Sequence, residues 1–174
     1  MILGVLALVL ALSPASAAEG SASRMQDTVP IEALDGAYVV PVLVNGVLPL
    51  KFIVDSGSTD VSIPAEVAWT LKKLGAMTGA DFLGSKTYML ADGSKVSSEI
   101  YRLASLKIGG LVMQDVTVRI SPEKSSLLLG QSFLRRLKSW SVDNAKQVMI
   151  LTGMEPDRVR TAAAATQAEA QALP

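Results

Sequence analysis

Between residues 38 and 54 the chain has a two-residue period. Branched and apolar residues occupy every second position up to Val44, Asn45-Gly46 follows, and the alternation resumes from Leu48 to Val54. A period of two is the spacing of side chains on one face of a strand, and Asn-Gly is the preferred pair for a tight two-residue hairpin turn. The pattern predicts an antiparallel hairpin whose second strand ends directly before Asp55.

Three more segments combine β-favouring residues with a central turn signal. They span residues 86–100 around Ala91-Asp92-Gly93-Ser94, residues 101–120 around Gly109-Gly110, and residues 140–150 around Asp143-Asn144. Short strands separated by regular turn signals are typical of an all-β barrel or sandwich.

Two short helices are predicted between the strands. Residues 64–75 begin with Pro and end with Gly, and Val67, Leu71 and Leu74 form one apolar stripe. In residues 131–137 the apolar side chains are expected to face the core and the two arginines to face water. The predicted fold class is therefore all-β with two short helices.

The two ends of the chain differ in composition from the middle. Residues 18–35 are small and polar and read as a linker, and residues 153–174 form an Ala/Gln-rich tail that we expect to be disordered or loosely helical. The folded domain is predicted to span residues 36–152.

The first residues resemble a secretory signal. An apolar run from Met1 to Leu12 is followed by Ser13-Pro14 and by Ala15-Ser16-Ala17, a small-x-small cleavage pattern. The run is short for a bilayer span. We expect a signal peptide over residues 1–17, cleavage after Ala17 and an exported mature chain; the alternatives are an uncleaved membrane anchor and a buried helix.

The amino-acid composition excludes several kinds of catalytic and metal site. The chain has no His and no Cys, which excludes Ser-His-Asp and Cys-His catalysis, His-ligated zinc, disulfides and iron–sulfur clusters. The 16 basic and 16 acidic residues balance, and no basic stripe of the kind that binds nucleic acid is present. We expect no metal, no cofactor and no nucleic-acid partner.

Asp55 is the polar residue that most needs an explanation. It ends the apolar strand in the stretch FIVDSGST. Burial of a lone carboxylate costs several kcal/mol unless the group is paired, hydrogen-bonded or neutralised. Asp55 therefore either caps a turn through an Asx hydrogen bond or is required there by chemistry.

A second motif favours chemistry. Leu127-Leu128-Leu129-Gly130 is an apolar run that ends in Gly and opens a short helix. Together with Asp55-Ser56-Gly57 it resembles the retroviral-type (retropepsin-like) aspartic proteases, particularly their bacterial members, and LLLGQSFLRRLKSWSVDNAKQVMIL is similar to the usual ending of that family. The resemblance covers roughly residues 36–152. It implies a single-lobe closed β-barrel and, with the export signal, a periplasmic location.

The resemblance implies proteolysis by paired carboxylates. Aspartic proteases use two carboxyl groups about 3 Å apart that share one proton. This chain contains one Asp-Ser-Gly, so the implied enzyme is a homodimer in which Asp55 of each subunit is catalytic and the substrate is a polypeptide.

The same resemblance assigns roles to other positions. Ser56 and Gly57 would support the catalytic turn, and Leu129 and Gly130 would form a structural segment that crosses behind it. The expected substrate-binding residues are Ser58, Asp60 and three residues of a flap hairpin, Ala91, Asp92 and Gly93.

Two other classes of function stay open on the sequence. One is a non-catalytic peptide-binding β-barrel module of the cell envelope. The other is a structural envelope protein whose Ala/Gln tail makes the contacts. A strictly monomeric chain would favour the first, and loss of function on removal of the tail would favour the second.

Overall fold

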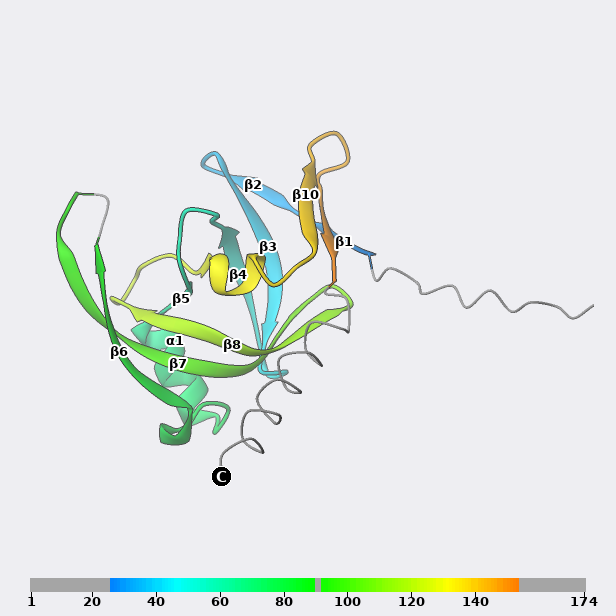
Figure 1. The fold of residues 1–174 in the computed structure, drawn as a ribbon. Helices are drawn as coiled ribbons and strands as arrows, with labels where there is room; N and C mark the ends of the chain where they lie inside the picture. Colours follow the sequence, from blue (N-terminus) through cyan, green and yellow to red (C-terminus); the bar gives the residue numbers. More distant parts are fainter. Residues whose placement is uncertain (1–25, 90–91, 154–174) are drawn as a thin grey trace, which may run out of the picture.

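The computed structural model in Figure 1 describes residues 26–89 and 92–153. Strands make up most of the described chain, with two short α-helices and one 3₁₀ turn. The strands are β1 (Gln26–Pro30), β2 (Glu32–Leu34), β3 (Ala37–Val44), β4 (Leu48–Val54), β5 (Val61–Pro64), β6 (Phe82–Met89), β7 (Lys95–Ile108), β8 (Leu111–Ser121), β9 (Leu128–Leu129), β10 (Ser139–Asp143) and β11 (Val148–Thr152). The helices are α1 (Ala65–Lys73), α2 (Gln131–Leu134) and the 3₁₀ turn η1 (Gly79–Asp81).

Eight of the strands form one sheet whose pairings close on themselves. The order is β2-β3-β4-β9-β5-β8-β7-β6, and an additional pairing joins β3 to β7. Strands β3, β4, β9, β5, β8 and β7 therefore form a continuous circuit, with β2 and β6 attached outside it. The predicted fold class, all-β with two short helices, is confirmed.

The four predicted hairpins are all present as antiparallel pairs: β3 with β4, β6 with β7, β7 with β8, and β10 with β11. In the first hairpin Asn45 and Gly46 have φ values of 48° and 69°, as their residue types predict. The prediction of a two-residue turn was wrong: Val44 pairs with Leu48, so the loop contains three residues. Val47 belongs to the turn, since its N–H donates to the carbonyl of Val44 at 3.0 Å.

Both predicted helices are present. Pro64 precedes α1 with a φ of −62°, and the chain turns at Gly75 with a φ of 67°. Leu71 is buried as expected, but Leu74 is 56% exposed because α1 ends at Lys73 and the apolar stripe ends with it. Helix α2 is shorter than predicted, although Leu137 beyond its end is buried.

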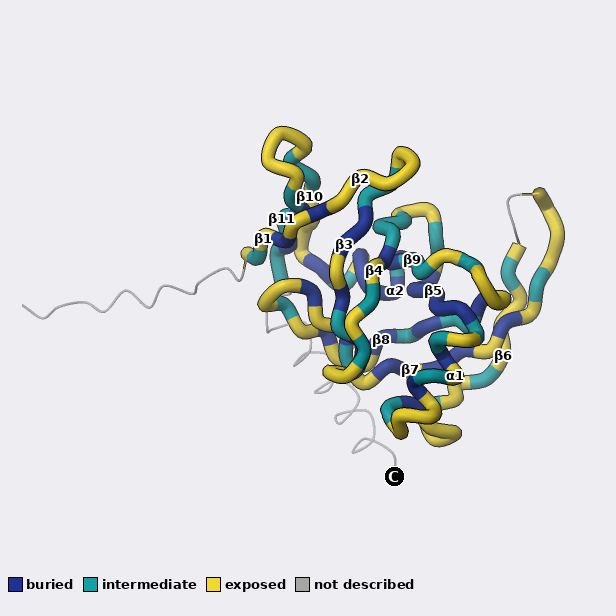
Figure 2. Tube along the Cα trace, turned by 180° about the vertical axis from the view of Figure 1, so that it is seen from behind, coloured by how far each residue is buried: buried dark blue, intermediate teal, exposed yellow. Residues whose placement is uncertain are grey.

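The core lies inside the strand circuit and against the two helices. Figure 2 shows the buried positions gathered along the inner strands and α2, with exposed positions at the turns and along β6. The largest fully buried side chains are Phe52, Phe133, Ile63, Leu71, Met77, Leu103, Leu106, Ile108, Leu129, Leu134, Met149 and Leu151. Both β4 and β9 supply side chains to this core; β4 leads into the turn that carries Asp55, and β9 pairs in parallel with the end of β4.

The predicted linker is partly wrong. Residues 26–34 form β1 and β2, and β1 joins β11 and β10 in a separate three-stranded sheet. Val29 and Ile31 are 2% and 6% exposed, so this segment is held by packing as well as by strand pairing. The predicted signal peptide, the start of the linker and residues 154–174 of the tail lie outside the described residues. Within residues 26–89 and 92–153, no helix has the length and apolar character needed to cross a membrane.

Candidate active site

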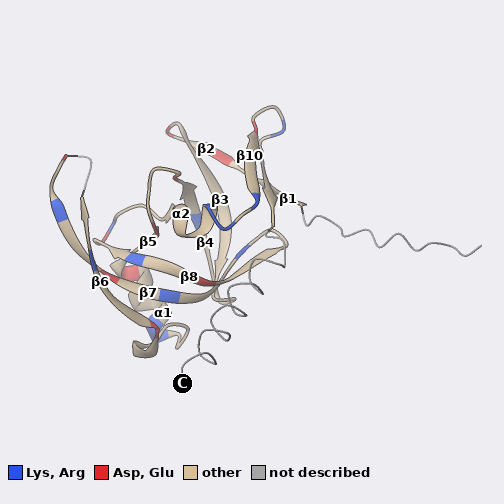
Figure 3. Cartoon of the chain, in the orientation of Figure 1, with Lys and Arg blue, Asp and Glu red and all other residues tan. Residues whose placement is uncertain are grey.

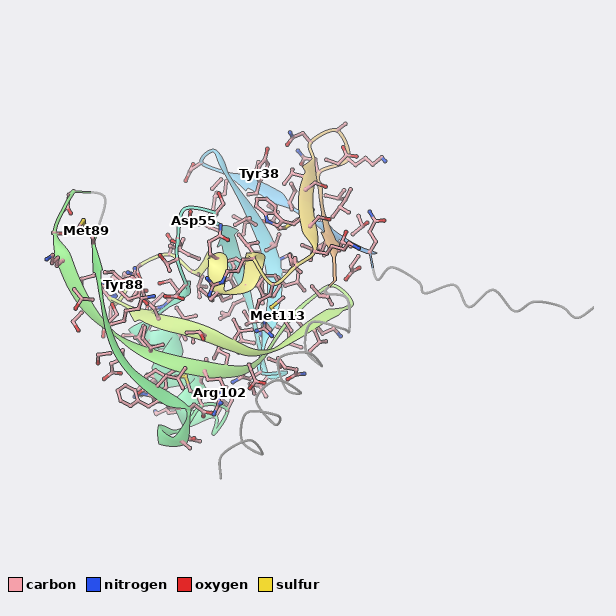
Figure 4. All side chains as sticks on the ribbon, in the orientation of Figure 1. Tyr38, Asp55, Tyr88, Met89, Arg102 and Met113 are labelled. Carbon is pink, nitrogen blue, oxygen red and sulfur yellow. The ribbon has the colours of Figure 1, made fainter. Side chains whose placement is uncertain are left out.

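Asp55 lies at the start of the loop that joins β4 to β5 (Figure 4). Its side chain is half-buried and accepts two hydrogen bonds from its own loop. The Gly57 N–H donates to Oδ1 at 2.9 Å, and the Ser58 hydroxyl donates to Oδ2 at 2.8 Å. The Asx bond of the turn interpretation is therefore present. Because an ionised carboxylate has about four acceptor sites, these bonds orient the group and leave it able to bind water.

Strand β9 lies between the two strands that flank this loop. It pairs in parallel with β4, with Val54 opposite Leu129, and antiparallel with β5, with Ser62 opposite Leu128. The Asp55 N–H donates to the Leu129 carbonyl at 3.2 Å. The segment after β9 continues the attachment, since the Gln131 N–H donates to the Ser58 carbonyl at 2.9 Å. The backbone of the loop from Asp55 to Asp60 is thus held by hydrogen bonds to a part of the chain about 70 residues further along.

Gly130 packs directly against the backbone of the loop. A Cβ atom at this position would lie 2.3 Å from the carbonyl oxygen of Asp60 and 2.9 Å from that of Ser58. Contacts this short do not occur, so the packing requires the absence of a side chain at residue 130. Gly57 is also close to the carboxylate, with a hypothetical Cβ 3.3 Å from Oδ1 of Asp55.

Asp60 closes the loop and is buried, with 8% of its side chain exposed. Its Oδ2 accepts hydrogen bonds from Lys86 Nζ at 2.9 Å and from the Tyr88 hydroxyl at 2.6 Å. Burial, and next the hydrogen bond to Asp60, raise the pKa of Tyr88 above its usual range. Tyr88 therefore keeps its proton and acts as a donor to Asp60.

The predicted flap residues form the tip of the β6–β7 hairpin. The Ser94 hydroxyl and N–H both donate to Oδ1 of Asp92, at 2.7 and 2.9 Å, and Gly93 has a φ of 82°. These hydrogen bonds from Ser94, the side-chain bond first, hold the pKa of Asp92 below its usual value. Ala91 lies outside the described residues. Among the residues that are described, no hydrogen bond joins the tip at 92–94 to the loop at 55–60.

The charged side chains of the described residues are dispersed over the fold. Within the described ranges no group of three or more acidic side chains is arranged to hold an ion. Figure 3 shows acidic and basic positions distributed among strands and loops, with no single stripe of either sign.

Comparison with protein families places the loop in context. A family model described as "gag-polyprotein putative aspartyl protease" matches residues 40–136, more than half of the chain and all of the segments just described. The chain belongs to the retropepsin-like aspartic protease family. Among curated proteins, no sequence matches the chain significantly.

A solved structure supports the same assignment. The chain is similar to the crystal structure of a retropepsin-like aspartic protease from Rickettsia conorii, with 26% sequence identity and a TM-score of 0.54. The match covers 74% of this chain and 90% of the other. Family and fold together make this a protein of the aspartic protease type.

The predicted site residues of the retropepsin-like chain fall into two groups. Asp55, Ser56, Gly57, Ser58 and Asp60 share one loop, with Leu129 and Gly130 packed behind it, whereas Asp92 and Gly93 lie apart at the hairpin tip. Their roles in catalysis and substrate binding stay predictions.

Several residues that support the loop were missed. The Gln131 side-chain amide donates to the Ser56 carbonyl at 2.7 Å. Ser132 is 6% exposed, and its hydroxyl accepts from the Val61 N–H at 2.8 Å and donates to the Thr117 carbonyl at 2.7 Å. Both lie inside the quoted stretch LLLGQSFL, where polar residues next to a buried Gly were the available signal. Lys86 and Tyr88 gave no such signal, because they approach Asp60 only through the tertiary fold.

Proposed function

We propose that the chain is an aspartic endopeptidase that acts as a homodimer, with Asp55 of each subunit forming the catalytic pair. The observation that carries the proposal is the loop itself. A half-buried carboxylate directly follows strand β4, is oriented through both oxygens, and rests on a segment fixed by backbone hydrogen bonds and Gly130. Preorganised carboxylates of this kind are what acid–base chemistry at a peptide carbonyl requires.

The homodimer follows from counting carboxylates. The sequence contains one Asp-Ser-Gly, and the retropepsin-like mechanism needs two such groups at one site. A two-fold axis beside the loop would bring the two copies of Asp55 together. Ser56 is exposed next to Asp55, a position from which it would bond to the partner's loop.

The reaction is a general acid–base hydrolysis. Two carboxyl groups about 3 Å apart hold one proton between them, since both cannot ionise at that separation. The ionised member accepts a proton from water, and the water oxygen bonds to the carbonyl carbon while the protonated member donates to the carbonyl oxygen. The carboxyl group that accepted the proton from water then donates it to the amine nitrogen as the C–N bond breaks, and the other carboxylate takes back its proton as the carbonyl re-forms. Gly57 N–H and Ser58 Oγ would keep each carboxylate oriented throughout.

A cleavage assay on a peptide library tests the proposal, run with and without pepstatin. The Asp55→Asn variant should lose at least about 10²-fold in activity, because its side chain can neither accept nor share the proton. Asp35→Asn is the matched control, since Asp35 is exposed in a turn with a φ of 49° that Asn tolerates well. Full activity in Asp55→Asn would refute the mechanism.

A mixing experiment tests the shared site separately. If wild-type and Asp55→Asn chains exchange subunits at equal concentration, about one quarter of the dimers carry two wild-type chains. Activity should then fall to about a quarter of the value for wild-type alone at the same total concentration, whereas independent monomeric sites would give about a half. Peptide binding without cleavage by the wild-type chain would instead identify a non-catalytic binding module.

We also propose export of the mature chain to the bacterial periplasm. The support is the apolar run and cleavage pattern in residues 1–17. N-terminal sequencing of the protein made in a bacterial host should find Ala18 as the first residue, and an intact N-terminus would contradict cleavage.

A further inference from the structure

Asp60 connects two parts of the molecule that the sheet does not join directly. It ends the catalytic loop, whereas its two hydrogen-bond donors, Lys86 and Tyr88, come from β6. Lys86 and Tyr88 are two positions apart and lie on the same face of the strand, where they pair with Ser98 and Val96 across the hairpin. Figure 4 shows Tyr88 on β6 and Asp55 on the separate loop.

Strand β6 is otherwise weakly held. It stands at the end of the strand order, so its backbone pairs with β7 on one side only. A register shift between Phe82 and Gly84 interrupts even that pairing. The side chains on its outer face, at Ser85, Thr87 and Met89, are exposed. An edge strand of this kind depends on side-chain contacts for its position.

Two cationic side chains lie close to the ring of Tyr88, the residue that donates to Asp60. The Lys86 ammonium lies 4.9 Å from the centre of the Tyr88 ring, and the Arg119 guanidinium lies 4.8 Å from it. Arg119 also donates to the Ser62 hydroxyl at 3.4 Å. A buried carboxylate is tolerated when charged donors satisfy it, and hydrogen bonds to a charged group are about twice as strong as neutral ones.

We infer that Asp60 is a positioning residue that fastens the β6–β7 hairpin to the loop carrying Asp55. A direct substrate contact, the role predicted from sequence, fits less well, because the side chain is 8% exposed and its Oδ2 already has two donors. The attachment sets where the hairpin lies relative to the catalytic loop. Its consequence for substrate binding rests on the proposed proteolytic function, but the attachment itself does not.

Hydrogen exchange measures the attachment without any need for activity. Asp60→Asn, Tyr88→Phe and Lys86→Met are compared with wild type over β6 and residues 92–98, with β3 and β4 as the internal reference. Loss of a hydrogen bond to a charged group should raise exchange in the hairpin about tenfold or more and leave the reference unchanged. The double variant Asp60→Asn/Lys86→Met should add little to Asp60→Asn, because the amide that replaces the carboxylate carries no charge to pair with Lys86.

Two controls match the chemistry of these variants. Glu32→Gln removes a carboxylate from an exposed pair with Lys51, and Lys95→Met removes an exposed ammonium from the same hairpin. Neither should change exchange in the hairpin. If Asp60→Asn does not fold, Tyr88→Phe and Lys86→Met decide the question, because both replace side chains that are at least partly exposed.

Kinetics provide the second measurement. If the hairpin holds substrate, the three variants should raise KM about tenfold or more while kcat changes much less, because Asp60 does not touch the reacting atoms. Hairpin exchange equal to that of the controls in Tyr88→Phe and Lys86→Met would overturn the inference. Faster exchange throughout the chain would also overturn it, since the contact would then be merely structural. If wild type cleaves nothing, the proposed function fails and exchange alone decides the attachment.

Discussion

The loop from Asp55 to Asp60 and the hairpin formed by β6 and β7 are held by different kinds of interaction. The loop is fixed mainly through its backbone, by hydrogen bonds to Leu129, Gln131 and Ser132 and by contact with Gly130. The hairpin is attached to the loop through the side chains of Lys86 and Tyr88. The loop therefore has a backbone support, whereas the attachment of the hairpin to the loop depends on single side chains.

The largest effect is expected at Gly130, which packs against the loop. Gly130→Ala should lower the free energy of unfolding by about 3 kcal/mol, the upper end of the range for overpacking, because the new methyl group would meet backbone that has no rotamer to change. Urea denaturation measures the loss. Gly79→Ala is the control, since nothing lies within 4 Å of a Cβ there and the change should stay within about 0.5 kcal/mol. Equal results for the two variants would show that the close packing of Gly130 does not support the loop.

A smaller loss is expected at Ser132. Ser132→Ala leaves the buried N–H of Val61 without its acceptor, which should cost about 2 kcal/mol in the free energy of unfolding. The exposed Ser126→Ala is the matched control and should be neutral within about 0.5 kcal/mol. If Ser132→Ala were equally neutral, the loop would not depend on this residue for its support.

The smallest effect is expected at the hairpin tip and depends on pH. The pKa of Asp92 is lowered in the folded chain. The ionised carboxylate therefore stabilises the turn fully above the unfolded pKa of about 3.9, and this stabilisation is lost as the pH falls through the lower pKa of the folded chain. The NMR shift of the Ser94 amide should titrate with a midpoint below about 3.9, and the stability of the whole chain should not follow it. The Asp92→Asn variant keeps an acceptor without titrating and should abolish the transition. A midpoint at or above the unfolded value would contradict the turn geometry.

Local patterns predicted most of the architecture. The β3–β4 hairpin is visible in the sequence because its alternation and its Asn-Gly turn agree, and α1 is visible because Pro64 and Gly75 mark its limits. Strands β1 and β2 were missed because their residues are mostly exposed and polar, with Pro30 between the two buried residues Val29 and Ile31. Their structure depends on partners elsewhere in the chain.

In the candidate site, too, the features set by local sequence could be predicted and those that depend on distant residues could not. Asp55 and Gly130 could be identified because each stands at the end of an apolar run, a local feature. The contacts of Asp60 could not, since Lys86 and Tyr88 lie 26 and 28 residues further along and carry no motif. The roles of Ser132 and Gln131 were within reach, because both are polar residues in an otherwise apolar motif.

The parallel pairing of β4 with β9 has a consequence for synthesis of the protein. Asp55 is translated early, but the strand that must lie beside it starts at Leu128. A nascent chain that ends before this residue has nothing to insert between β4 and β5, so their facing edges remain open and the carboxylate turn has no support. Non-local pairings of this kind form slowly. The order of translation therefore delays completion of the turn until most of the domain has left the ribosome.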